Sequence, residues 1–244
     1  MLAQAPAANA PPPGPAPLNA QGRVLLGGAS PQDKGVWLPV FSNANAVAQV
    51  KDVPFQPWAK ALFDARTIHE LEPHTRCKAS GVARQFITPY GVEFVEMAQL
   101  DRVYIFDIGG PHTYRTIYMD GRSHPADLES TNYGHSIGWW NGNTLMVDSV
   151  GFNEDFWMQR RGFAHTEKLH TLESFTRLND SSIEYRVTID DPGAYTAEWT
   201  DGFNLRWQAD QELFEYVCQQ ANYAHELMVG QKGSTVDRSS PIVP

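Results

Sequence analysis

Alternating apolar and polar residues dominate the chain from residue 92 to residue 217. The runs are rich in Val, Ile, Tyr, Phe and Thr, and turn residues separate them, which is typical of half-buried strands. No stretch between the runs has the length and period of a helix, so hairpins should join the strands. About eight strands are predicted, at residues 92–98, 102–108, 113–119, 135–140, 143–152, 168–178, 183–190 and 203–217.

Helical periodicity occurs in two places outside these runs. Trp58, Leu62, Ala65 and Ile68 recur near a 3.6-residue period after Pro57, which predicts a helix that ends before residue 73. Residues 219–228 favour a second, short helix. Residues 23–55 have no sustained period, and we expect an extended segment over the surface there.

These elements predict an all-β fold with one or two short flanking helices. An antiparallel meander closed into a lipocalin-like barrel around a cavity accounts best for the pattern, and a two-sheet sandwich is the alternative. Residues 1–22 are rich in Pro and Ala and should form a disordered arm. The barrel should span residues 23–230 as one domain, followed by a polar tail over 231–244.

Composition and charge exclude two classes of partner. The formal net charge of -9 and the lack of clustered Lys and Arg argue against nucleic acid. No apolar run approaches the length of a membrane-spanning helix. The expected partner is therefore a small-molecule ligand or substrate, with a homo-oligomer left open.

The N-terminal segment and the cysteines favour export. Ala3-Gln4-Ala5 resembles the small-residue end of a secretory signal, so a periplasmic or secreted location is predicted. In an oxidising compartment Cys77 and Cys218 would close a long loop as a disulfide, and two buried thiols are the alternative. No C-x-x-C pair indicates structural zinc.

A candidate acid–base pair comes from the turn at Asn141-Gly142. A two-residue turn centred there places His135 opposite Asp148, on a face shared with Ile137 and other apolar residues. A carboxylate can hold a histidine in one tautomer and raise its basicity. We therefore expect both side chains to be shielded and to act in catalysis.

A second hairpin, through residues 179–182, brings another such pair together. Centring its turn there aligns Leu172 with Ile189, opposes Arg177 to Glu184, and brings His170 opposite Asp191. Longer loops allow the register to slip, so this alignment depends on where the turn is centred.

Further polar residues precede that hairpin, in HTEKLH. His165, Glu167 and His170 are acid–base candidates, and a metal site formed by the three is the alternative. In a strand His165 and Glu167 would share a face and His170 would point the other way, so a metal site needs a bulge.

Substrate-binding candidates lie in the stretch YMDGRSHP and among the aromatic residues. Arg122 and His124 should occupy a loop at the barrel mouth, where the guanidinium can orient an oxygen-rich ligand. Tyr118, Trp139 and Trp157 could line an apolar pocket.

Four phrases carry a resemblance to a known family: RTIYMDGRSHP, GHSIGWWNGNTLMVDSVGFN, HTEKLHTLESFTRL and VTIDDPGAYT. They resemble the DGR-HP, GHS-G-W, H-[ST]-E-x-L-H and TIDDP motifs of a widespread, mostly uncharacterised family of exported bacterial β-barrel proteins. The match covers about residues 53–222 and includes both cysteines. Asn143 departs from the pattern, because many relatives carry Asp there. The resemblance implies export and one fold, and it supplies no reaction.

The function expected from these features is acid–base catalysis in a barrel pocket. His135, Asp148, His165, Glu167 and His170 should converge and act as a lyase or isomerase on a small organic molecule. No cofactor is expected, because the chain has no Gly-rich phosphate loop, and it has no nucleophile elbow. The alternatives are a non-catalytic ligand-binding barrel and a metal-dependent enzyme.

Overall fold

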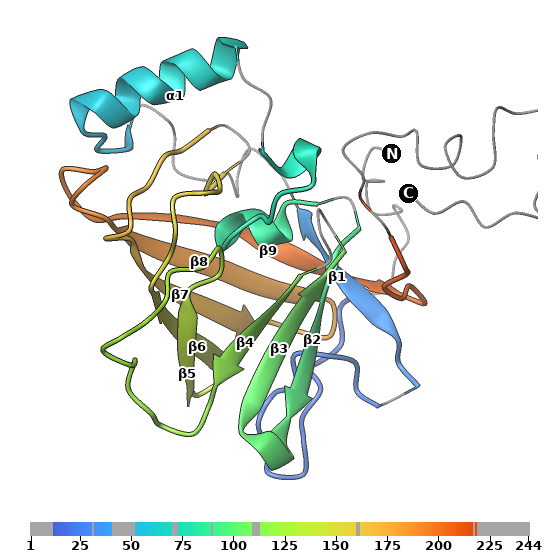
Figure 1. Cartoon of the computed structure of the whole chain (residues 1–244). Coiled ribbons are helices and arrows are strands. Elements are labelled where there is room, and N and C mark those ends of the chain that lie inside the picture. Colours follow the sequence, from blue (N-terminus) through green and yellow to red (C-terminus); the bar gives the residue numbers. More distant parts are fainter. Residues whose placement is uncertain are drawn as a thin grey trace, which may run out of the picture.

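The computed structural model describes residues 12–30, 32–40, 52–69, 73–88, 90–108, 113–159, 162–216 and 218. These residues form a closed barrel in which each strand pairs with the next and the last pairs with the first (Figure 1). Its nine strands are β1 (Gly35–Val40), β2 (Val92–Met97), β3 (Arg102–Asp107), β4 (Tyr114–Tyr118), β5 (His135–Asn141), β6 (Thr144–Val150), β7 (His170–Arg177), β8 (Ser182–Asp190) and β9 (Trp199–Ala209). The all-β barrel is therefore confirmed, and the count exceeds the expected eight.

The additional strand is β1, which lies in the segment expected to be extended over the surface. It pairs with β9 from Gly35↔Ala209 to Val40↔Asn204 and so completes the barrel. Pro39 hides the strand in the sequence, because proline normally argues against pairing on both sides. β1 meets β2 only at Trp37↔Val92, which leaves Pro39 on a part of the strand with one partner.

The predicted antiparallel meander is wrong for one pair of strands, β4 and β5. β4 and β5 run parallel and pair only at Ile117↔Ser136 and Tyr118↔Ile137. A parallel pair needs a long return connection, and residues 119–134 supply it. This connection passes over the outer surface of the barrel, where it forms part of the candidate site below.

Short helices lie at the ends of the barrel. The predicted first helix is confirmed as α1 (Pro57–His69) (Figure 1). It is anchored where Trp58 Nε1 donates to Gly193 O. Three single-turn 3-10 helices follow at Pro73–Arg76, Ala83–Phe86 and Ala98–Leu100. No helix among the described residues is long and apolar enough to cross a membrane. The expected helix over 219–228 lies outside the described residues.

The barrel interior holds a buried ion pair among aromatic and aliphatic side chains. Phe86 enters from the second of these short helices and packs on Phe175 and Tyr185. Beside them Arg115 forms a bidentate pair with Glu173, and both side chains are almost fully buried. These buried side chains of the described residues lie in the interior, where the sequence predicted a ligand cavity.

Each nitrogen of the Arg115 guanidinium has a partner, and these partners are polar residues of three other strands. Its Nε donates to Ser136 Oγ at 2.9 Å and its Nη2 to Ser149 Oγ at 2.7 Å. The Tyr185 hydroxyl donates to Glu173 at 2.9 Å. This network joins β4 to β5, β6, β7 and β8 from the inside, where the β4–β5 ladder is only two residues long.

Both hairpin registers differ from the predicted ones. The β5–β6 turn is centred on Gly142-Asn143, so His135 faces Val150 and Asp148 faces Ile137. This shift of two residues keeps His135 and Asp148 on one face.

In β7–β8 the register is displaced by one residue, so that Arg177 faces Ile183 and His170 faces Asp190. A one-residue slip exchanges the two faces of a strand. Leu172 consequently points outward, while Arg177 is buried and donates to the carbonyls of Leu25 and Gly27. The expected pairs Arg177–Glu184 and His170–Asp191 are therefore wrong.

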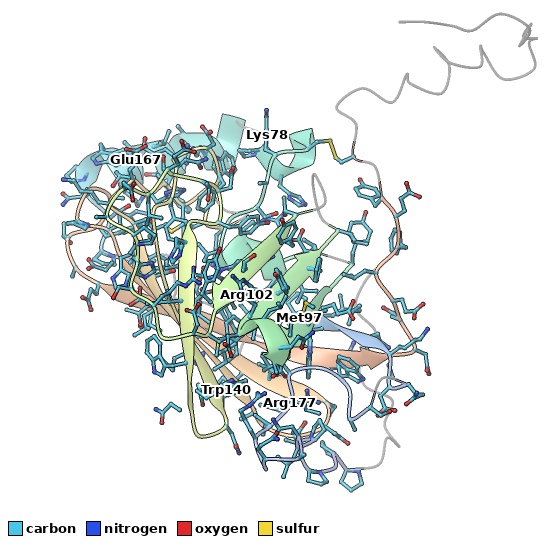
Figure 2. The ribbon with its side chains drawn as sticks, turned by 60° about the horizontal axis from the view of Figure 1, so that its bottom comes forward. Lys78, Met97, Arg102, Trp140, Glu167 and Arg177 are labelled. Carbon is cyan, nitrogen blue, oxygen red and sulfur yellow. A yellow bond between two sulfur atoms is a disulfide. The ribbon has the colours of Figure 1, made fainter. Side chains whose placement is uncertain are left out.

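The segments before the first strand and after the last strand are each linked to another part of the molecule. Cys77 and Cys218 form a disulfide, as predicted, and it is the yellow bond beside Lys78 in Figure 2. At the other end, the Gly14 amide donates to Asp180 and Leu18 forms a bridge with Val24. Gly14, which belongs to the expected arm, thus contacts the turn between β7 and β8, and residues 1–11 lie outside the described residues.

Candidate functional site

Three histidines and one aspartate meet on the outer face of the barrel. His135, Asp148 and His170 project from the neighbouring strands β5, β6 and β7, and His124 comes from the connection over residues 119–134. These groups therefore lie outside the barrel and not in the interior pocket that the sequence predicted. The inner faces of the same strands carry Ser136 and Ser149, which buried Arg115 requires as partners.

Asp148 is the centre of the cluster. Its Oδ1 accepts from His170 Nε2 at 3.0 Å and from His124 Nε2 at 3.1 Å. The other nitrogen of His124, Nδ1, lies 2.8 Å from His135 Nδ1. His135 thus reaches Asp148 through His124 and not directly, and the four side chains form one hydrogen-bonded chain.

The hydrogen bonds assign the tautomers. A carboxylate can only accept, so the Nε2 atom of His124 carries a hydrogen and, in a neutral ring, its Nδ1 is an acceptor. His135 must then donate from Nδ1, which leaves its Nε2 with a lone pair. Among the described residues His135 Nε2 has no hydrogen-bond partner.

Electrostatics favour the neutral form of His135. Partial burial lowers its pKa, and the nearby His124 and Arg122 lower it further, against a smaller opposing effect of Asp120. A histidine with a lowered pKa is unprotonated at neutral pH and can accept a proton. The side chains remain accessible, with 19% of His124 and 41% of His170 exposed.

An aromatic ring and a guanidinium border the base. The Tyr118 ring stacks on the His135 ring, with centroids 5.0 Å apart, and the Arg122 guanidinium lies 4.0 Å from the Tyr118 ring centroid. Arg122 Nε also donates to Asp120 Oδ1 at 2.8 Å, and this bond holds the pKa of Asp120 at about 2. Asp120 thus neutralises Arg122 and fixes its position.

Local sequence explains how the connection presents His124. Gly121 adopts a left-handed φ of 75° and allows the tight turn in which Asp120 binds Arg122. Pro125 favours an extended backbone for His124, the residue before it. Farther along, Thr131 N donates to Gly151 O and Asn153 N donates to Thr131 O, which fastens the connection to the end of β6.

A hollow adjoins this cluster. It has a volume of about 370 Å³ and lies where β4 has ended and β5 continues, so the wall of the barrel is open there. Met119 and Gly121, which flank the turn at Asp120, line it, as does Arg102, whose guanidinium also lies over Tyr118. The far wall includes Trp139, which is 44% exposed and points outward from β5.

Two of the predicted catalytic residues make other contacts. The His165 ring is buried, its Nε2 donates to Phe156 O at 3.0 Å, and burial lowers its pKa. Glu167 accepts from Ser130 Oγ, and Figure 2 places it at the opposite end of the molecule from Trp140. His165, Glu167 and His170 therefore do not form the alternative metal site, and no group of three or more potential ligands could hold a metal among the described residues.

Of the five predicted substrate-binding residues, four lie at the cluster or the hollow beside it and one lies elsewhere. Tyr118, Arg122 and His124 belong to the cluster, and Trp139 lines the adjoining hollow. Trp157 is buried under the Arg66 guanidinium. Sequence analysis missed Asp120 and Arg102. The pairing of Asp120 with Arg122 could have been predicted, because the two residues flank a glycine turn.

Comparison of the chain with family models, with curated proteins and with solved structures finds no match.

Proposed function

We propose that the protein is an exported enzyme that transfers protons on a small organic molecule, as a lyase or an isomerase, without an organic cofactor. The hydrogen-bonded chain from His170 through Asp148 and His124 to His135 is the observation that carries this proposal. Export is supported by the disulfide, since such bonds persist in oxidising compartments.

In this proposal His135 is the general base. Its Nε2 takes a proton from a carbon of the substrate, and the Nδ1 hydrogen moves to His124. The resulting His124 imidazolium donates to the Asp148 carboxylate, which compensates the new positive charge at 3.1 Å. Return of the proton to another substrate atom gives isomerisation, and loss of a leaving group from the neighbouring carbon gives elimination.

Substrate recognition would use the surface beside the base. The substrate carbon next to His135 would contact the Tyr118 ring, and the rest of the molecule would extend into the hollow beside Met119. A volume of about 370 Å³ suits a small organic molecule.

The first prediction tests proton transfer without knowledge of the substrate. We expect the wild-type protein to exchange a carbon-bound hydrogen, or to eliminate a small group, in at least one compound of a library of organic acids, ketones and unsaturated molecules in D₂O. His135→Ala and Asp148→Asn should each slow that exchange about 100-fold or more, the usual contribution of acid–base catalysis. Mass spectrometry of the library measures both.

Asp155→Asn is the matched control, because Asp155 is exposed in a neighbouring loop and should leave exchange unchanged. Compounds that are retained on the protein without exchange or elimination would contradict catalysis and indicate a ligand-binding barrel.

The second prediction concerns the pKa of His135. Nuclear magnetic resonance of ring-labelled protein should show His135 titrating below the ordinary histidine value of about 6.5. In His124→Ala the pKa of His135 should rise, because part of its burial and the electrostatic effect by which His124 lowers it are both removed. The lowered pKa also means that the unfolded chain binds this proton more readily, so His135 costs stability as the pH falls below about 6.5. A wild-type value at or above 6.5 would contradict the assigned base.

A further inference from the structure

The barrel wall is nearly interrupted between β1 and β2. β2 has partners in β3 along all of its residues, whereas on its β1 side only Val92 is paired, with Trp37. Beyond that pair the two strands diverge. On the side away from β3, no other described segment makes a backbone hydrogen bond to Glu93–Glu96. The Glu96 side chain is engaged there, by Arg23 and by the Leu26 amide. An open strand edge is a template for pairing with another extended chain.

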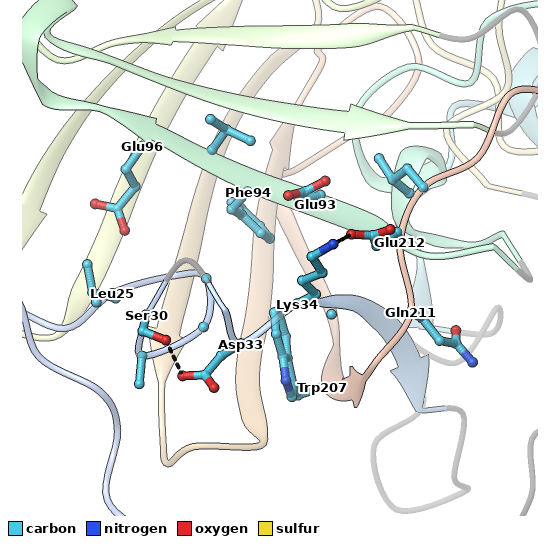
Figure 3. A pocket seen from close by; sticks show the side chains of 16 residues that line it. Leu25, Ser30, Asp33, Lys34, Glu93, Phe94, Glu96, Trp207, Gln211 and Glu212 are labelled. Atoms are coloured by element: carbon cyan, nitrogen blue, oxygen red, sulfur yellow. Dashed lines mark hydrogen bonds and ion pairs between the residues drawn. The ribbon is translucent and has the colours of Figure 1, made fainter.

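A groove occupies the wedge between the diverging strands (Figure 3). Its volume is about 660 Å³, and one wall is the edge of β2 from Glu93 to Glu96. Gly35 and Trp207 form the opposite wall, and the chain from Gly27 to Lys34 closes one side. Four strand residues span about 14 Å, so the groove has the length of a short extended peptide.

The charges in the groove are not balanced. Lys34 forms an ion pair with Glu212, which Figure 3 shows at the mouth of the groove. Glu93 has no ion-pair or hydrogen-bond partner among the described residues. Burial raises the pKa of Glu93, and the nearby Glu212 carboxylate raises it further. A second cation beside Glu93 would therefore be stabilised there.

We propose that this groove binds an extended peptide with basic side chains, which pairs with β2 as an additional strand. Its backbone would complete the ladder along Glu93–Glu96, and a lysine or arginine beside Glu93 would supply the missing positive charge. Apolar side chains of the peptide would contact Phe94 on the inner side and Val95 on the outer side.

A second copy of this chain fits the groove less well. Pairing of two β2 edges would place the Glu93 carboxylates of both copies along one short ladder, and like charges facing each other across strands are destabilising. Glu96 adds little to this repulsion, because Arg23 already pairs with it at 2.6 Å. An unpaired acidic residue such as Glu93 protects an edge from self-association while it attracts a basic partner.

Fluorescence polarisation of the labelled peptide KVTVTVK tests the proposal. We expect saturable binding to the wild-type protein and binding at least about tenfold weaker to Glu93→Lys, equivalent to about 1.4 kcal/mol or more. Glu198→Lys is the matched control, because Glu198 is exposed before β9 and changes the net charge equally. Circular dichroism establishes that each variant is folded, and Glu212→Gln, which should weaken binding less, replaces Glu93→Lys if that variant is not.

Two further peptides separate strand pairing from charge attraction. KVTPPVK carries the same charge but cannot complete a ladder, and it should bind at least tenfold more weakly than KVTVTVK. EVTVTVE should not bind. Equal binding of KVTPPVK, equal affinity of a folded Glu93→Lys, or no binding of KVTVTVK at millimolar concentration would each overturn the proposal. Concentration-dependent dimerisation lost in Glu93→Pro would instead identify a second copy as the occupant.

Discussion

Arg115→Met is expected to lower the free energy of unfolding by about 3–5 kcal/mol, because it leaves the Glu173 carboxylate buried without its counter-ion. Both side chains are inside the barrel, with 1% and 0% of their surface exposed. The variant also removes the donors that satisfy Ser136 and Ser149. Urea denaturation followed by circular dichroism measures the loss.

The exposed pair of Arg186 and Glu184 is the control for this prediction. Its side chains are 46% and 37% exposed, so Arg186→Met should cost less than about 1 kcal/mol. Adding Glu173→Gln to Arg115→Met should recover part of the lost stability, because no unpaired charge then remains. A double variant as unstable as the single one would show that the ion pair is not the cause.

Removal of the disulfide is expected to have a similar effect. Cys77 and Cys218 are separated by 141 positions. In the chain-entropy model, closing so long a loop lowers the entropy of the unfolded chain and so raises its free energy by about 5 kcal/mol. Measured losses for native disulfides are about 2–5 kcal/mol. The paired variant Cys77→Ser/Cys218→Ser should therefore unfold at a much lower urea concentration than the oxidised protein.

Reduction offers an independent comparison. Wild-type protein treated with dithiothreitol should match the double serine variant, and oxidised protein in denaturant should show no free thiol to a thiol reagent. Two titratable thiols in protein prepared under oxidising conditions, or identical stability of oxidised and reduced protein, would refute the prediction.

The sequence predicted elements more reliably than the pairing between them. Trp58 and Ile68 lie within the confirmed helix, and the apolar alternation located seven of the strands to within a few residues. The eighth, β9 (Trp199–Ala209), begins and ends earlier than the predicted 203–217. Strand β1 was missed because Pro39 and Gly35 disrupt its pattern. The parallel β4–β5 pair was missed because local periodicity carries no information about strand direction.

The candidate site was predicted in part for the same reason. His135 and Asp148 were assigned to one face, and a two-residue error in register preserves a face. His124 joins them from a connection whose path no periodicity specifies. Local periodicity does not indicate that the shared face is the outer one. That outcome follows from Arg115, whose charge draws serines and a glutamate to the inner faces.

The pairing of β1 with β9 has a consequence for how the protein is made. Residues 35–40 leave the ribosome early, but their partners, residues 204–209, are among the last of the barrel to emerge. The hairpins from β5 to β9 form from neighbouring segments, whereas closure must wait for a contact between the two ends of the domain. During that interval the apolar stretch Val36–Leu38 can pair only with β2, at Trp37↔Val92, so it stays exposed to aggregation until β9 emerges.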